Sequence, residues 1–282
     1  MIQFNYDTLF GGFMVGLYKD FDKNKNIGGR DFVIGDIHGD LTGLNSNLSR
    51  IGFNKSTDRL FCTGDLVDRG MNSYDVLMLS KDSDWFYPLM GNHEWFVCLN
   101  FDKNRKRWFN EPDVNLSLGN RDGREFHLWH KSQGGGWLES LTFDELVNVR
   151  GVLQNMPIGA SVVTPSGGLV GLVHAEPTSD WNTLKSILRN CTLTDLLLEN
   201  EKSVGVPPLI QSRNRIKRFA GGDIDESGFI IENIDKVYVG HSITYSYFDV
   251  EVGESVSVGN IQYIDGGSWY NLGSDYPIIE LL

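Results

Sequence analysis

Side chains that could bind metal ions follow three short apolar runs in the first third of the chain. The three phrases are Gly35-Asp36-Ile37-His38-Gly39, Gly64-Asp65-Leu66-Val67-Asp68-Arg69-Gly70 and Gly91-Asn92-His93-Glu94. The apolar run before each phrase is typical of a buried strand, and the glycines suit a sharp turn at its end. We therefore expect three strand ends to bring aspartate, histidine and asparagine side chains together at the carboxyl edge of a sheet.

Two histidines in the second half of the chain follow apolar runs in the same way, in Leu172-Val173-His174 and Val239-Gly240-His241. The candidate metal ligands are therefore Asp36, His38, Asp65, Asn92, His174 and His241. Carboxylate and amide oxygens suit hard cations, and imidazole adds affinity for manganese, iron, cobalt or zinc. Six ligands are too many for one catalytic ion with open positions, so they predict two divalent cations about 3.5–4 Å apart.

Paired cations of this kind indicate hydrolysis of a phosphoric ester, because a hydroxide that bridges them can attack a phosphoryl group that they clamp. The leaving oxygen needs a proton, and His93, next to Asn92, is the candidate general acid. Asp68 lies on the neighbouring turn and is expected to orient the His93 ring and raise its basicity. Arg69 and Arg213 are candidate phosphate-binding residues, since a guanidinium can bind two phosphate oxygens at once.

The spacing of apolar residues predicts the elements that position these side chains. We expect strands at 31–35, 59–63 and 85–90, with helices over 41–51 and 72–80 and another that opens at Trp95. This alternation is typical of parallel strands with right-handed crossovers. Later strands are expected at 160–164, 169–173, 236–239, 246–252, 261–264 and 278–282, and helices at 138–153 and 181–200. The pattern predicts an α/β fold in which two mixed β-sheets pack as a sandwich flanked by helices.

No linker rich in Pro, Gly or Ser divides the chain, so we expect a single domain over residues 1–282. Within it, residues 1–30 are expected to be an N-terminal extension that packs on the core with a short hairpin. Residues 101–136 are expected to be a loop insertion on the substrate side. His127 and His130, inside that segment, are expected to be ordinary loop or packing residues.

Charge and composition exclude some classes of partner. The net charge of −12 argues against broad electrostatic binding to nucleic acid or to an anionic membrane. Three widely spaced cysteines predict a reduced protein without a cysteine-based zinc site. We expect no signal peptide and no membrane span, and hence a cytoplasmic protein. The sequence does not indicate an oligomeric state.

The phrases are similar to those of the metallophosphoesterase superfamily, and within it to the serine/threonine phosphoprotein phosphatase family. The likeness includes Ile51-Gly52-Phe53, Gly134 to Trp137 and Tyr263-Ile264-Asp265, and it is nearest to the small phosphatase of bacteriophage lambda. It implies the calcineurin-like metallophosphoesterase fold and metal-dependent hydrolysis of a phosphoric monoester, such as a phosphorylated protein or a small phosphoester. It also suggests a phage-encoded protein of the host cytoplasm.

The resemblance implies a role for each candidate residue. Asp36 and His38 would hold the first metal, Asn92, His174 and His241 the second, and Asp65 would bridge the two. His93 would be the general acid with Asp68 as its support, and Arg69, Asn92 and Arg213 would bind the phosphate. The expected metal is manganese, with iron, zinc or cobalt as alternatives.

Two departures from the family pattern leave a second substrate class open. Met90 stands where protein phosphatases of the family have an arginine, and Glu176 follows His174-Ala175 where aspartate is usual. Diadenosine tetraphosphatases of the same superfamily also lack that arginine, whereas Glu94 after His93 matches the protein phosphatases. The alternatives are therefore a nucleotide phosphohydrolase such as a diadenosine tetraphosphatase, and a non-catalytic binding module, against which the complete ligand set argues.

Overall fold

The computed structural model describes residues 16–21, 26, 28–110, 122–197, 205–270 and 275–282. The strands are β1 (Tyr18–Phe21), β2 (Asp31–Ile34), β3 (Arg59–Cys62), β4 (Phe86–Pro88), β5 (Gly159–Val163), β6 (Leu169–Val173), β7 (Lys236–Val239), β8 (Val256–Val258), β9 (Ile261–Tyr263) and β10 (Ile279–Glu280). The α-helices are α2 (Leu41–Arg50), α3 (Ser73–Asp82), α4 (Asn92–Lys103), α5 (Arg105–Phe109), α6 (Gly123–Ser132), α7 (Phe143–Gln154), α8 (Trp181–Arg189), α9 (Leu193–Leu197), α10 (Val206–Gln211) and α11 (Asn214–Ala220). The 3₁₀ helices are η1 (Gly135–Ser140), η3 (Glu226–Phe229) and η4 (Thr244–Ser246).

The strands form two mixed sheets, as expected. One has the order β10-β2-β3-β4, with β2, β3 and β4 parallel and β10 antiparallel to β2. The other has the order β1-β5-β6-β7-β9-β8, with β6, β7 and β9 parallel. Ile34 pairs with Cys62 at the ends of β2 and β3, and Val173 pairs with Val239 at the ends of β6 and β7. The loops that follow each pair of strands therefore begin side by side.

The two sheets pack face to face through alternate residues of their strands. Val33 of β2 and Phe61 of β3 belong to a buried cluster that also contains Val162 of β5 and Leu172 of β6. Their neighbours along the strands, such as Ile34, belong instead to the cluster that includes the helices. Because side chains alternate across a strand, one face of each sheet meets the other sheet and one face meets helices.

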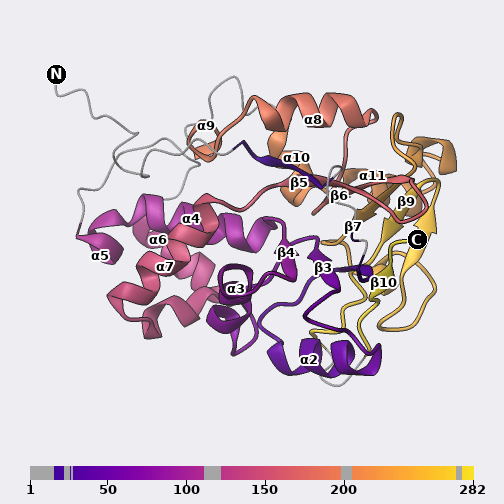
Figure 1. The fold of residues 1–282 in the computed structure, drawn as a ribbon. Coiled ribbons are helices and arrows are strands. Elements are labelled where there is room, and N and C mark those ends of the chain that lie inside the picture. The colour runs from indigo at the N-terminus through magenta and orange to yellow at the C-terminus, as the bar shows by residue number, and fades with distance from the viewer. Residues whose placement is uncertain (1–15, 22–25, 27, 111–121, 198–204, 271–274) are drawn as a thin grey trace.

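Helices cover the outer faces of the sandwich. In Figure 1, α2 and α8 lie on opposite sides of the strands, and α4 to α7 form a group beside them. Helix α2 begins where the Asp40 carboxylate accepts a hydrogen bond from the Gly43 backbone N–H, and it buries Leu44 and Leu48. Each of the first three phrases thus lies between a strand and a helix.

The helix expected over 181–200 is divided into α8 and α9 in its described part, and three other expectations differ more from the structure. Residues 246–252 are not a strand, because Tyr247 and Phe248 donate backbone hydrogen bonds to Thr244 in a tight turn. Their aromatic rings pack on the core. The apolar residues of this segment therefore indicate buried side chains and not an extended strand. The strand in this region is β8, further along the chain.

The segment 101–136, expected to be a loop, contains helices in its described part. Helix α4 extends to Lys103, and α5 and α6 follow. The buried residues of α6 are Phe126, His127 and His130. Two of the three are histidines and the apolar Leu128 is exposed, so the buried face of the helix is not the one that its apolar residues mark. Residues 111–121 lie outside the described residues.

The described part of segment 1–30 contains a strand rather than a hairpin. β1 pairs in parallel with β5 at the edge of the six-stranded sheet, with Tyr18 opposite Gly159. Residues 1–15 lie outside the described residues. Within the described chain, no helix is both long enough and apolar enough to cross a membrane.

Candidate metal centre

Loops from both sheets meet at the carboxyl ends of their strands. Asp36 and His38 follow β2, Asp65 follows β3, Asn92 and His93 begin α4 after β4, His174 follows β6 and His241 follows β7. All of these side chains are buried. The structure therefore brings together every residue that the sequence predicts as a metal ligand.

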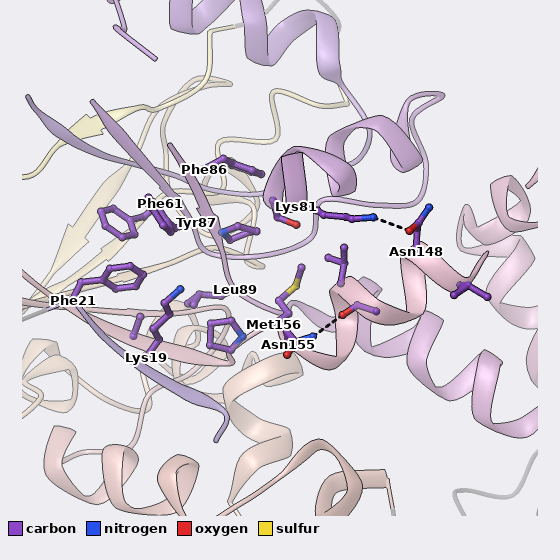
Figure 2. Close-up of a pocket in the computed structure, with 17 residues that line it drawn as sticks. Lys19, Phe21, Phe61, Lys81, Phe86, Tyr87, Leu89, Asn148, Asn155 and Met156 are labelled. Atoms are coloured by element: carbon purple, nitrogen blue, oxygen red, sulfur yellow. Dashed lines mark hydrogen bonds between the residues drawn. The ribbon is translucent and has the colours of Figure 1, made fainter. Parts of the chain in front are cut away.

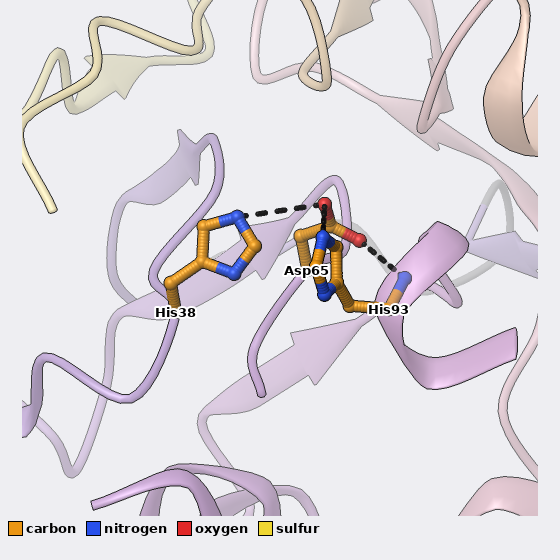
Figure 3. Close-up of side chains that lie close together, drawn as sticks. All are labelled: His38, Asp65 and His93. Atoms are coloured by element: carbon orange, nitrogen blue, oxygen red, sulfur yellow. Dashed lines mark hydrogen bonds and ion pairs between the residues drawn. The ribbon is translucent and has the colours of Figure 1, made fainter. Parts of the chain in front are cut away.

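Asp65 lies at the middle of this cluster. Figure 3 shows His38 and His93 close to its carboxylate, with His38 Nε2 3.6 Å and His93 Nε2 4.0 Å from Oδ2. On its other oxygen, His174 Nε2 lies 3.4 Å from Oδ1. Asp65 also forms a compact group with His174 and His241, whose potential ligand atoms all lie within 4.8 Å of one another. One carboxylate thus belongs to two sets of potential ligands.

The histidine rings are held so that an unprotonated nitrogen faces the cluster. His38 Nδ1 lies 2.8 Å from the Val67 carbonyl oxygen, and His174 Nδ1 lies 3.1 Å from that of Thr63. A carbonyl can only accept, so Nδ1 carries a proton in both rings and Nε2 is the atom that faces the cluster. His174 Nε2 lies 3.1 Å from Asn92 Oδ1, which places an imidazole and an amide oxygen side by side.

Backbone N–H groups orient the carboxylates. The N–H of His241 donates to Asp36 Oδ1 at 2.9 Å, and the N–H of His93 donates to Asp65 Oδ1 at 2.9 Å. Asp36 Oδ2 lies 3.9 Å from His38 Nε2. Each carboxylate therefore keeps an oxygen for a cation.

Several buried carboxylates lie together in the cluster, so a positive charge there would stabilise their ionised forms. Burial, and then the neighbouring carboxylates of Asp265 and Asp65, raise the pKa of Asp36 well above its ordinary value. Burial also raises the pKa of Asp265, which is hydrogen-bonded to Asp36. Burial lowers the pKa of His38 and of His241 well below the ordinary value, so both rings are neutral. Three buried carboxylates and neutral imidazoles are the donor set of a site for divalent cations.

A buried atom without a partner supports the same conclusion. His241 Nε2 is buried and makes no hydrogen bond to the described protein atoms. Leaving such a group unpaired costs about 1–3 kcal/mol. Because Nε2 belongs to a ring that lies beside Asp65 and His174, a cation in this cluster would satisfy it.

His93 is paired with Asp68, as the sequence predicts. His93 Nδ1 donates to Asp68 Oδ2 at 2.7 Å, which leaves Nε2 facing the cluster. Burial alone would lower the pKa of His93, but the carboxylates of Asp65 and Asp68 outweigh it and raise the pKa. The arrangement fixes the His93 ring through Nδ1 and turns Nε2 toward the cluster, where a general acid would have to act.

Two side chains that the sequence analysis did not assign to the site also hold Asp68. His130 Nε2 lies 2.9 Å from Asp68 Oδ2, and the Trp137 indole N–H donates to Asp68 Oδ1 at 2.8 Å. Burial would raise the pKa of Asp68, but hydrogen bonds from His130 and His93 lower it to about 2. His130 is therefore not an ordinary packing residue. No motif marked it, because the contact joins α6 to a loop 62 positions earlier in the chain.

Glu94 is a further residue whose role appears only in the structure. Its buried carboxylate accepts backbone hydrogen bonds from Asp65, Leu66 and Gly91 at 2.8 Å each, and from Val67 at 3.2 Å. Burial, and then the charge of Asp65, raise the pKa of Glu94 to about 7 despite these donors. Glu94 therefore joins the loop after β3 to the loop after β4.

The two candidate phosphate-binding arginines reach the cluster from different sides. Arg69 lies 2.6 Å from His38 Nε2 and 3.0 Å from His93 Nε2 through its two terminal nitrogens, and it stacks on the Trp269 ring. Arg213 donates to the His241 carbonyl oxygen at 2.8 Å. Met90, where the family pattern has an arginine, is fully buried in the main apolar cluster.

The sequence model for the Calcineurin-like phosphoesterase family matches residues 32–245, which include every predicted metal ligand. The chain belongs to this family. Enzymes of the family use divalent metals, and the buried histidine and aspartate groups of this phosphoesterase could bind them. The family and the two-sheet architecture agree, so the fold expected from the sequence is confirmed.

This phosphoesterase has relatives with two kinds of name. It is 25% identical to serine/threonine-protein phosphatase 2 of Salmonella typhimurium over 248 residues, which cover 88% of this chain and 92% of that protein. It is 30% identical to the symmetrical bis(5'-nucleosyl)-tetraphosphatase of Neisseria meningitidis serogroup A, but over 104 residues only, or 36% of this chain and 37% of that protein. A special nearness to the lambda phosphatase stays a prediction.

Solved structures show the same fold. A putative diadenosine tetraphosphatase has a TM-score of 0.50 at 17% identity and covers 94% of this chain and 97% of its own. A mutant cold-active protein tyrosine phosphatase has a TM-score of 0.53 at 15% identity, with 95% of this chain and 78% of its own covered. At these identities the likeness concerns the fold alone.

An open hollow of about 820 Å³ adjoins the metal centre of the phosphoesterase. Its lining includes His38, Arg69 and Trp269, so it leads directly to the cluster around Asp65. The cavity in Figure 2, of about 450 Å³, lies elsewhere, between β1, β4 and α7. No predicted metal ligand lines it, whereas His38 lines the hollow beside Arg69.

Proposed function

We propose that this phosphoesterase is a dinuclear-metal-dependent phosphoric monoester hydrolase that acts as a serine/threonine protein phosphatase. The observation that carries the proposal is the shared position of Asp65, which lies between His38 on one side and His174 with His241 on the other. The six predicted ligands would hold two divalent cations, most readily manganese. When bound, such cations acidify a water molecule and stabilise the negative charge of a phosphoryl group.

The chain's own residues supply the rest of the chemistry. Arg69 extends its guanidinium into the cluster, where it would bind phosphate oxygens together with Asn92 and Arg213. His93 carries one proton on Nδ1, bonded to Asp68, and would donate a second proton from Nε2 to the leaving serine or threonine oxygen. Asp68 stabilises the doubly protonated ring, since its carboxylate remains ionised.

One relative favours a second candidate function. The tetraphosphatase of Neisseria meningitidis is 30% identical over its matched segment. In addition, Met90 stands at the position where the protein phosphatases have an arginine. A diadenosine tetraphosphatase would use the same cations and the same general acid on a phosphoric anhydride. The near full-length match to serine/threonine-protein phosphatase 2 supports the protein phosphatase more strongly.

Two assays test the proposal. Hydrolysis of p-nitrophenyl phosphate should require manganese and stop on chelation, and equal activity in both conditions would refute a metal-dependent mechanism. A phosphoserine peptide and diadenosine tetraphosphate should then be compared at equal concentration with the manganese-loaded enzyme. Faster turnover of the nucleotide would replace the protein phosphatase with the second candidate.

A further inference from the structure

Asp68 accepts three hydrogen bonds, and one of them comes from a buried histidine outside the metal cluster. His93 and His130 both meet Oδ2, at 2.7 and 2.9 Å, and Trp137 meets Oδ1 at 2.8 Å. His130 and Asp68 are both fully buried. The orientation and protonation of His130 therefore directly affect Asp68, the carboxylate that is hydrogen-bonded to the candidate general acid His93.

The other nitrogen of His130 decides which proton the ring carries. Asn100 Nδ2 lies 2.9 Å from His130 Nδ1. An amide NH₂ group can only donate, so His130 Nδ1 must be unprotonated. The proton of the neutral ring then sits on Nε2, which is the atom that faces Asp68. A second proton on Nδ1 would point at the Asn100 donor, so the ring is held neutral.

The orientation of the Asn100 amide follows from its other partners. The Trp108 indole N–H, which can only donate, lies 3.2 Å from Asn100 Oδ1. Asn104 Nδ2 lies 3.1 Å from the same oxygen. Two donors therefore mark Oδ1 as the acceptor, and Nδ2 is left to face His130 and, at 3.3 Å, His127. The orientation of the Asn100 amide therefore follows from the hydrogen-bond donors around it.

We propose that His130, held by Asn100 as the neutral Nε2–H tautomer, is a positioning residue that orients the Asp68 carboxylate toward His93. The inference rests on the proposed function, because it concerns the proton that His93 delivers. A neutral donor fixes Asp68 in space without cancelling its charge. The whole negative charge of the carboxylate therefore acts on His93.

The first experiment reads the tautomer without any activity assay. The zinc-loaded enzyme, labelled with ¹⁵N-histidine, should show His130 in long-range ¹H–¹⁵N spectra as a neutral ring protonated on Nε2 at pH 7. The signal is assigned by its absence in His130→Gln. A ring protonated on Nδ1, or on both nitrogens, would overturn the proposal.

The second experiment compares variants that keep or remove the donor. His130→Leu should lower kcat for a phosphoserine peptide about 10- to 100-fold, because the leaving alkoxide depends on the proton from His93. The loss for p-nitrophenyl phosphate should be smaller than about threefold, since its leaving group needs little protonation. His130→Gln, whose amide N–H₂ can still donate to Asp68, should restore most of the peptide activity.

The control is His127→Gln. His127 also contacts Asn100, but among the described residues its other hydrogen-bond partner is Glu139 and not Asp68, so this variant should stay within about twofold of wild type on both substrates. An equal loss on both substrates in His130→Leu, or no rescue by His130→Gln, would show a merely structural role. An inactive wild-type enzyme would refute the proposed function instead, and the tautomer spectrum would still decide the assignment of His130.

Discussion

Backbone conformations that most residues avoid are concentrated at the metal centre. Among the described residues, the non-glycine positions with positive φ are His38, Asp65, Asp68, Arg69, Asn110, Asn233 and His241. Five of these seven belong to the predicted site. Such conformations cost about 1–3 kcal/mol each and persist only where the surroundings enforce them. The hydrogen bonds of Glu94 and the buried carboxylates provide that enforcement here.

The role of His93 predicts a dependence on the leaving group. His93→Ala should lower kcat for a phosphoserine peptide by about 10²- to 10⁴-fold, the usual contribution of a general acid. Turnover of p-nitrophenyl phosphate should fall much less, because p-nitrophenolate departs without a proton. Steady-state kinetics on both substrates with manganese check this, and a uniform loss would remove His93 from the acid role.

The low pKa of Asp68 predicts how stability changes in acid. Hydrogen bonds hold its folded pKa at about 2, below the ordinary 3.8, so its ionised form stabilises the fold above pH 3.8. That contribution should be lost as the pH falls from about 4 toward 2. The difference in free energy of unfolding between wild type and Asp68→Asn should therefore shrink over this range.

Urea unfolding of the chelated proteins at several pH values measures this difference. Asp275→Asn is a suitable control, because Asp275 is exposed and its contact with Arg50 lies at the surface. A gap between wild type and Asp68→Asn that stays constant down to pH 2 would contradict the assignment.

At the scale of elements, the helices between 92 and 140 support the hydrogen-bonded pair of His93 and Asp68. Helix α4 carries His93 in its first turn, α6 contributes His130, and η1 contributes Trp137. Helix α4 packs on α6, and α6 packs on η1. The segment 101–136 was expected to be a loop on the substrate side. In its described part it instead contains His130, which holds the Asp68 carboxylate.

The turn between α6 and η1 predicts a strong effect of a small substitution. Gly134 has φ of +105°, and a Cβ there would collide with the backbone of Arg69. Gly134→Ala should therefore displace Arg69 and lower kcat/KM about tenfold or more, since the strain and the clash act together.

Gly136→Ala is the matched control for this prediction. A Cβ at Gly136 would meet only Lys131, with Cγ at 3.5 Å, which is an ordinary contact. Its kcat/KM for p-nitrophenyl phosphate should stay within about twofold of wild type. If Gly134→Ala behaves in the same way, the close packing of this turn on Arg69 does not matter for activity.

At the scale of the whole molecule, the candidate metal centre contains residues from both sheets. Asp36, Asp65 and Asn92 come from the four-stranded sheet, whereas His174 and His241 come from the six-stranded one. Cations held between them would connect the two layers of the sandwich. Metal binding should therefore stabilise the fold as a whole and not only the loops.

Thermal unfolding tests this coupling. Manganese at about 100 times its dissociation constant should add about 2.7 kcal/mol per site to the free energy of unfolding, relative to chelated protein. Asp65→Asn, which alters the residue shared by both ligand groups, should lose most of that increment. A melting temperature unchanged by manganese in the wild type would argue that no cation binds between the sheets.

The sequence was sufficient where a motif combines a strand end, a glycine turn and a ligand side chain. The first three phrases predicted β2, β3 and β4 to within three residues, because buried parallel strands have continuous apolar runs. It failed where buried positions are polar. In α6 two of the three buried side chains are histidines, which an apolar pattern does not mark. Around Tyr247, the aromatic residues lie in a turn and pack on the core, so their sequence resembles that of a buried strand.

The types and order of the ligand residues, and the fold that must carry them, were determined by the sequence alone. The partners of Asp68 were decided by the tertiary structure, since His130 and Trp137 reach it across more than 60 positions. The physical reason is that some contacts join residues near in the sequence and others join residues far apart in it. A strand end fixes its own loop through nearby atoms, but a hydrogen bond between distant helices exists only after the core has packed.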